Sequence, residues 1–192
     1  MPDDPTANVH LNDPRAMRAL AHPTRLRLLG ELRARGPQNV GMLSDLVDEA
    51  PGSVSYHLGT LAKHGFVEEA PELAPNGRER WWRAAHPRTV WDPVELLERP
   101  ELRVAGELLQ RTILRRWFQK LETYLELQAT FDTAWVRAAA GSDSILYLTV
   151  EELGELRDEL EALAARWQEK SDSQREGVAQ VTLLFHAFRS EP

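Results

Sequence analysis

Residues 51–64 carry side chains that are suited to hydrogen bonding at close range. Val54, Leu58 and Leu61 recur at spacings of four and three, which predicts a helix with one buried stripe. The opposite side of this helix and its flanks are small and polar and carry no acidic residue. Small residues let a helix approach a groove closely, and hydroxyl groups can bond to base edges or phosphates. The residues expected to face the bases of double-stranded DNA are Gly52, Ser53, Ser55 and Tyr56, and those expected to face its backbone include Thr60 and Lys63.

A second group of candidate contacts follows in residues 66–84. Residues 66–70 and 78–84 each have the composition of a strand, and Asn76-Gly77 between them is a strong signal for a hairpin turn. Arg78 and Arg80 would then lie near the hairpin tip. We expect these two arginines to contact the DNA backbone beside the groove.

Proline and capping residues divide the first half of the chain into helices. Asp13 and Pro14 form an N-cap and first-turn pair, and Pro23 and Pro51 are suited to the first position of a helix. The predicted helices span residues 13–21, 23–35, 41–49 and 51–64, after a polar, mobile N-terminal arm at residues 1–12. Helices followed by a hairpin with basic residues form a winged helix-turn-helix, which we expect over residues 13–92.

Three stretches of this sequence resemble the ArsR-type winged-helix repressors. They are ALAHPTRLRLLGEL at 19–32, VGMLSDLVDEAPGSVSYHLGTLAKHGFV at 40–67 and GRERWWRAA at 77–85. The resemblance implies a homodimeric DNA-binding protein in which the helix at 51–64 reads DNA and the first and last helices of the domain form the dimer. Many members of this family begin that helix with Ser or Thr, whereas this chain has Ala50, which predicts an end less stable by about 1 kcal/mol. The wing is also longer than usual.

The composition excludes several kinds of site. The chain contains no cysteine, so it has no disulfide, no thiolate metal ligand and no counterpart of the family's metal-sensing thiolates. No two of the six histidines are four residues apart, and we expect no metal site and no other cofactor. His57 flanks the buried stripe, where it is either a packed residue or a phosphate contact. There is no glycine-rich phosphate loop and no nucleophile motif, so we do not expect an enzyme.

The charge and hydropathy of the chain bear on its partners and location. The net charge is −7, but residues 1–92 carry only −1 and residues 93–192 carry −6. The acidic half therefore lies outside the predicted DNA-binding domain. No apolar run approaches the roughly 18 residues that a membrane helix needs, and the first residues lack the features of a signal peptide. We expect a cytoplasmic protein that does not bind membranes.

The second half, residues 93–192, predicts a helical or α+β domain. A long helix at about 101–128 carries apolar residues on more than one side, which suits a dimer interface. A capping box at Thr149 and Glu152 begins a second helix, and short strands are expected at 144–148 and 180–188. The aromatic side chains could line a pocket for a small-molecule effector or simply form a packed core, and they include Trp117, Phe118, Tyr124, Trp135 and Trp167.

Together these patterns predict a mainly α fold with small β elements. The expected function is that of a transcriptional regulator, a repressor, that binds an inverted repeat as a homodimer and responds to a small-molecule effector. The alternative is a winged-helix module that binds protein instead of DNA, which the acidic charge balance favours.

Overall fold

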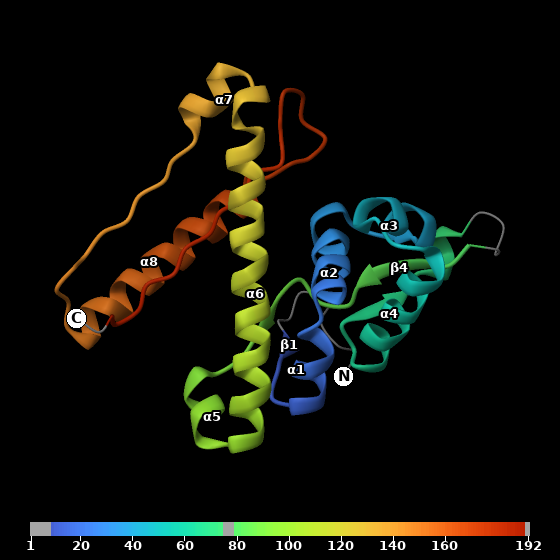
Figure 1. Cartoon of the computed structure of the whole chain (residues 1–192), viewed down its shortest axis with the longest axis horizontal. Coiled ribbons are helices and arrows are strands. Elements are labelled where there is room, and N and C mark those ends of the chain that lie inside the picture. The colour runs from blue at the N-terminus through green and yellow to red at the C-terminus, as the bar shows by residue number, and fades with distance from the viewer. Residues whose placement is uncertain (1–8, 75–78, 191–192) are drawn as a thin grey trace. The chain divides into compact units, whose positions relative to one another are not determined.

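The chain forms a mainly helical fold with two small sheets, and the computed structural model describes residues 9–74 and 79–190 (Figure 1). It separates into two compact units, residues 1–125 and residues 126–192. Within the described ranges, no helix is long and apolar enough to cross a membrane.

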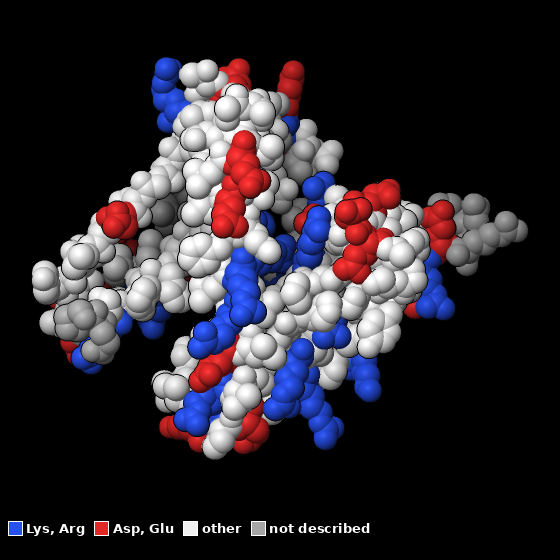
Figure 2. All heavy atoms as spheres, viewed as in Figure 1, with Lys and Arg blue, Asp and Glu red and all other residues white. Residues whose placement is uncertain are grey.

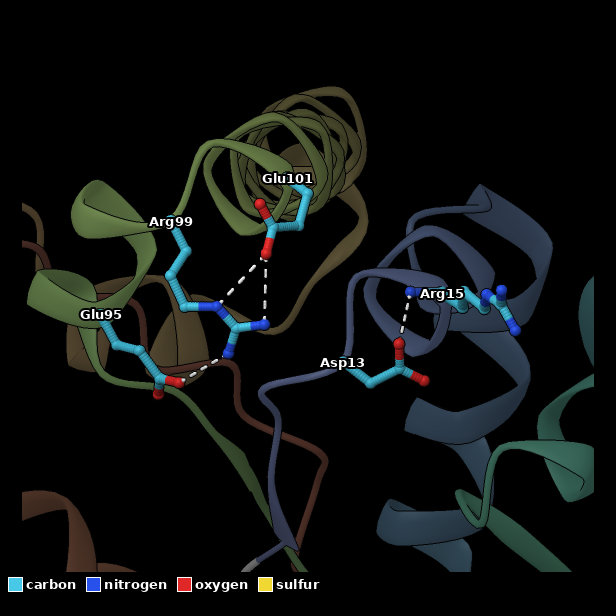
Figure 3. Close-up of polar contacts among 5 residues, drawn as sticks. All are labelled: Asp13, Arg15, Glu95, Arg99 and Glu101. Carbon is cyan, nitrogen blue, oxygen red and sulfur yellow. Dashed lines mark hydrogen bonds and ion pairs between the residues drawn. The ribbon is translucent and has the colours of Figure 1, made fainter.

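Four helices form the first part of the N-terminal unit, at the positions that proline and capping residues predict. They are α1 (Pro14–Leu20), α2 (Pro23–Arg35), α3 (Val40–Val47) and α4 (Pro51–Lys63). Asp13 is the N-cap of α1 and accepts a hydrogen bond from the backbone of Arg15 at 2.9 Å (Figure 3). Pro stands at the first turn of α1, α2 and α4, as expected for a residue whose missing N–H is not needed there.

A three-stranded antiparallel sheet follows the helices. Its strand order is β2 (Gln38–Asn39), β4 (Trp81–Ala84) and β3 (Val67–Glu69), so a short strand before α3 completes the predicted pair. Trp82 is buried and Trp81 is half-buried, because neighbouring residues of a strand point to opposite faces. A 3-10 turn, Pro71–Leu73, lies between β3 and β4. The predicted Asn76-Gly77 turn lies outside the described residues.

The hydrophobic core of the N-terminal unit joins the four helices to β3 and β4. Val54, Leu58 and Leu61 of α4 have no exposed surface, as their spacing predicts, and they belong to one cluster with Phe66 and Trp82. This cluster fixes α4 against the rest of the domain, with its other side outward.

The core also includes residues beyond position 92. After α5 (Pro93–Glu98), the helix α6 (Pro100–Leu127) places Leu102 and Leu109 in the same cluster. Arg99, between the two helices, forms ion pairs with Glu95 and Glu101 (Figure 3). The first compact unit includes α5 and α6 as far as Leu125, whereas the sequence predicted a boundary at 92/93.

Residues 9–11 are held in the fold, whereas the sequence predicted a mobile arm at residues 1–12. β1 (Val9–His10) pairs in parallel with β5 (Thr89–Val90), and Leu11 is 4% exposed within the core. The backbone N–H of Leu11 donates to the carbonyl of Val90 at 2.7 Å. Residues 1–8 lie outside the described ranges.

The C-terminal unit is built on helices. A 3-10 turn (Gln128–Thr130), α7 (Thr133–Ala138) and α8 (Val150–Glu169) follow α6. The predicted capping box is confirmed, because Glu152 N–H donates to Thr149 Oγ1 and Thr149 N–H donates to Glu152 Oε2. The predicted strands at 144–148 and 180–188 are wrong, since neither segment has strand structure. Apolar, β-branched residues favour an extended chain, but a strand also needs a hydrogen-bonded neighbour.

Candidate nucleic-acid interface

The outward face of α4 is exposed in the way that its sequence predicts. Tyr56 is 68% exposed, and Gly52, Ser55, Gly59 and Lys63 are also exposed. Ser53 and Thr60, on the flanks, are half-buried, and the Thr60 hydroxyl donates to the Tyr56 carbonyl at 3.0 Å. No acidic residue stands on this helix. A surface of small and hydroxyl-bearing side chains is thus available to a partner.

A carboxylate fixes the start of α4. The N-cap residue, Ala50, offers no side-chain hydrogen bond, but Glu49 before it accepts one from Ser53 Oγ at 2.5 Å and another from Thr24 Oγ1 at 2.6 Å. Glu49 therefore ties the first turn of α4 to the first turn of α2. A negative charge at a helix N-terminus is also favourable. Ala50 offers the first backbone N–H groups of α4 no side-chain acceptor, as the sequence predicts, and Glu49 instead anchors this end of the helix through the Ser53 hydroxyl.

The turn between α3 and α4 holds Glu49 in place. Asp48 ends α3 in the left-handed region, with φ of 54° and ψ of 50°. Asp tolerates this region better than most residues other than glycine. The guanidinium of Arg27 donates to the last carbonyls of α3, on Leu46 and Val47. Arg27 is therefore a structural cap rather than a phosphate contact.

Hydrogen bonds hold the Glu49 side chain in its charged form. The hydroxyls of Ser53 and Thr24 lower its pKa from the usual value of 4.5, in that order of importance. The carboxylate is consequently ionised at neutral pH. An ionised carboxylate only accepts hydrogen bonds, so both hydroxyls must donate their protons to it.

Two histidine rings lie beside each other near Glu49. The rings of His22 and His57 have centroids 4.6 Å apart, and His57 Nε2 lies 3.9 Å from Glu49 Oε2. Burial, as the largest cause, lowers the pKa of both histidines. His57 is only 8% exposed, so it is the packed residue of the two alternatives that the sequence left open. The described residues contain no group of three or more His, Asp or Glu side chains placed to hold a metal ion.

The predicted wing contacts have different outcomes. Arg78 lies outside the described residues. The Arg80 side chain is 72% exposed and lies 4.0 Å from Glu69, which leaves it accessible to a partner. Arg83, by contrast, forms ion pairs with Glu68 and Glu72 of the same wing.

Arg25 is a candidate that the sequence prediction did not include. Its guanidinium lies close enough to Tyr56 for the tyrosine to influence its pKa, which burial lowers. Arg25 stands on the first turn of α2, and periodicity alone could not show that this turn adjoins the outward face of α4. Figure 2 also shows basic side chains along α1 and the adjoining part of α6, and acidic ones near α3.

The candidate effector residues belong to both units of the chain. Trp117, Phe118 and Tyr124 stand on α6, whereas Trp135 and Trp167 stand on α7 and α8. Phe118, Trp135 and Trp167 are exposed, and the Nζ of Lys170 lies 5.0 Å from the centre of the Trp167 ring. The effector pocket stays a prediction.

Comparisons with known proteins identify one part of the chain. Residues 20–70 match a family model described as a helix-turn-helix domain. A solved structure titled "The crystal structure of transcriptional regulator PA4135" is similar over 58% of this chain and 80% of its own, with 19% sequence identity and a TM-score of 0.33. No curated protein matches. Residues 20–70, which include α2, α3 and α4, form a helix-turn-helix domain within a mainly helical chain.

Proposed function

We propose that this chain is a transcriptional regulator that binds double-stranded DNA through α4. The observation that carries this proposal is the exposed, acid-free face of α4 within a helix-turn-helix domain. In such domains the second helix of the motif enters the major groove, where small residues permit close approach. Gly52, Ser53, Ser55 and Tyr56 would face the bases.

The proposed contacts to the DNA backbone come from residues around the base-facing side of α4. Thr60 and Lys63 stand on α4 itself, and Arg78 and Arg80 belong to the wing. Lys63, Arg78 and Arg80 would bind phosphates and orient the domain without reading sequence. Thr60 would join them once its hydroxyl is released from the Tyr56 carbonyl. Arg25 joins this group because it combines a positive charge with a place beside Tyr56.

We further propose a homodimer that represses transcription at an inverted repeat. A dimer would place two copies of α4 about one DNA turn, roughly 34 Å, apart. The second half of α6 supports this, because Phe118, Leu121 and Leu125 are exposed apolar residues on one helix. The repressor role rests on the resemblance of the sequence to the ArsR-type repressors.

The proposed response to a small-molecule effector depends on α6. This helix spans the boundary between the two units at Leu125. It is also bonded to the DNA-binding part, since Arg116 donates to the Leu26 carbonyl. The Thr112 hydroxyl donates to the Leu108 carbonyl within α6 at 2.8 Å and lies 3.2 Å from the Ala21 carbonyl oxygen. A ligand that favoured one position of α6 would change DNA affinity by linkage.

DNA binding can be tested with a random-sequence library of duplexes. The protein should enrich particular sequences, and its affinity should fall steeply with salt concentration. Tyr56→Ala should lose the preference for the enriched duplex, whereas Tyr147→Ala should keep it, because Tyr147 is 96% exposed in the other unit. A chain that enriches no sequence and binds DNA at no salt concentration would contradict the proposal.

A protein-binding module is the second candidate. A hollow at the α3–α4 turn is lined by acidic side chains, including Asp45, Asp48 and Glu49. This surface would repel phosphates and suits a basic segment of another protein. Weak binding to all DNA, without sequence preference, would favour this candidate.

A further inference from the structure

Ser53 and Ser55 lie on opposite flanks of the outward side of α4, and their hydroxyl groups differ in what they can offer a partner. Ser53 Oγ lies 2.5 Å from Glu49 Oε2 and must donate its only proton to that carboxylate. Ser55 is exposed, and no hydrogen bond of its hydroxyl is found among the described residues. Ser55 can therefore donate or accept, whereas Ser53 can only accept.

This restriction is fixed by the surroundings of Glu49. Its second oxygen accepts from Thr24 Oγ1 at 2.6 Å, so the carboxylate is held from two helices and cannot turn away from Ser53 without losing both bonds. His57, which is buried, closes the same side with Nε2 at 3.9 Å. The two lone pairs of Ser53 Oγ that remain are its only means of bonding to a base.

We propose that the Glu49–Ser53 hydrogen bond makes Ser53 an acceptor-only reading residue that selects adenine or cytosine on the DNA strand it contacts. In the major groove, adenine presents the N6 amino group and cytosine the N4 amino group, whereas guanine O6 and thymine O4 are acceptors at the corresponding place. If Ser53 Oγ faced guanine O6 or thymine O4, two acceptors would meet and neither would form a hydrogen bond. The inference rests on the proposed DNA binding by α4. It adds that the base contacted by Ser53 must present a hydrogen-bond donor.

The test compares base preferences, selected from one random duplex library, for the wild-type chain and four variants. Ser53→Ala should relax the preference at one position by roughly three- to tenfold, as expected for the loss of one hydrogen bond. Glu49→Ala should relax the same position, because the freed Ser53 hydroxyl could then donate as well as accept. Tyr147→Ala, at an exposed site in the other unit, is the control and should leave every position unchanged.

Glu49→Gln separates this role from a purely structural one. The amide keeps the size of the side chain but can donate to Ser53 Oγ, which would free its proton for guanine or thymine. A change confined to the Ser53-dependent position is expected. If Glu49 only positioned α4, the preference would weaken at every position together, and the inference would be overturned. Thermal unfolding of each variant identifies any that fails to fold.

Two other results would also overturn the inference. The Ser53-dependent position could prefer guanine or thymine in the wild-type chain, or no position could respond to Ser53→Ala. A wild-type chain that enriches no sequence would instead contradict the proposed function itself. The two failures are therefore distinguishable in the same experiment.

Discussion

Gly30 on α2 offers a sharp test of how α6 is joined to the helix-turn-helix domain. In an isolated helix, replacing an interior glycine by alanine stabilises the helix by about 1 kcal/mol. Here a Cβ on residue 30 would lie 2.5 Å from Arg116 Nη2 and 2.8 Å from Arg116 Nη1. The guanidinium of Arg116 must move if Gly30→Ala is made.

The magnitude follows from what Arg116 would lose. Its guanidinium donates to the Leu26 carbonyl, and burial lowers its pKa. A hydrogen bond to a charged group contributes about 1.5–3 kcal/mol, and the half-buried position of Arg116 favours the lower end. The lost hydrogen bond outweighs the stabilisation of about 1 kcal/mol that alanine brings to the helix. Gly30→Ala should therefore destabilise the chain by roughly 0.5–1 kcal/mol.

The effect of Gly30→Ala on the free energy of unfolding should change sign in a variant that lacks Arg116. In an Arg116→Ala background, Gly30→Ala should stabilise by about 1 kcal/mol, because nothing then opposes the helix preference. Urea denaturation of the wild type, both single variants and the double variant gives a coupling free energy, which we expect to be about 1.5–2 kcal/mol. Equal effects of Gly30→Ala in both backgrounds would refute the proposed contact between α2 and α6.

Three further predictions concern the core, the histidines and the wing. Leu11→Ala should cost roughly 2–4 kcal/mol and lower Tm, whereas no change in Tm would indicate a mobile arm. Burial lowers the pKa of His22 and His57 in the folded chain, so the unfolded chain takes up protons first and the free energy of unfolding should fall as pH drops below 6.5. Urea denaturation of a variant with Gln at both positions should show a smaller fall, and an unchanged pH profile would argue against buried neutral rings. Arg80→Ala should reduce the slope of log affinity against log salt by about 0.9, and Arg166→Ala, at an exposed site in the other unit, should leave that slope unchanged.

The helices of the N-terminal unit could be predicted because their signals are local. Pro23 and Pro51 begin helices, and Val54, Leu58 and Leu61 define one buried stripe. The exposed residues on the opposite side of α4 followed from the same 3.6-residue period. The same reasoning located the capping box at Thr149, because both partners lie within four residues.

Contacts between distant residues were not predictable in this way. Leu11 is buried because β1 pairs with β5, whose residues lie about eighty positions later. Arg83 meets Glu68 and Glu72 only once the sheet has formed. Single-residue patterns record propensity and spacing, but they do not record which elements become neighbours.

Glu49 shows how this limit affects the candidate site. Its charge suggests a residue that would keep DNA away, and its position after α3 suggests only a turn. In the folded chain it accepts hydrogen bonds from α2 and α4 and thereby determines the hydrogen-bonding character of Ser53. The sequence predicted which residues face outward, whereas the fold determines what one of them can offer.

The most direct test of the account is a competition between a library-selected duplex and a scrambled duplex of the same composition. The wild-type chain and Tyr147→Ala should prefer the selected duplex by more than roughly tenfold, and Tyr56→Ala should bind both duplexes almost equally. A preference that survives Tyr56→Ala would contradict the claim that the exposed face of α4 reads DNA.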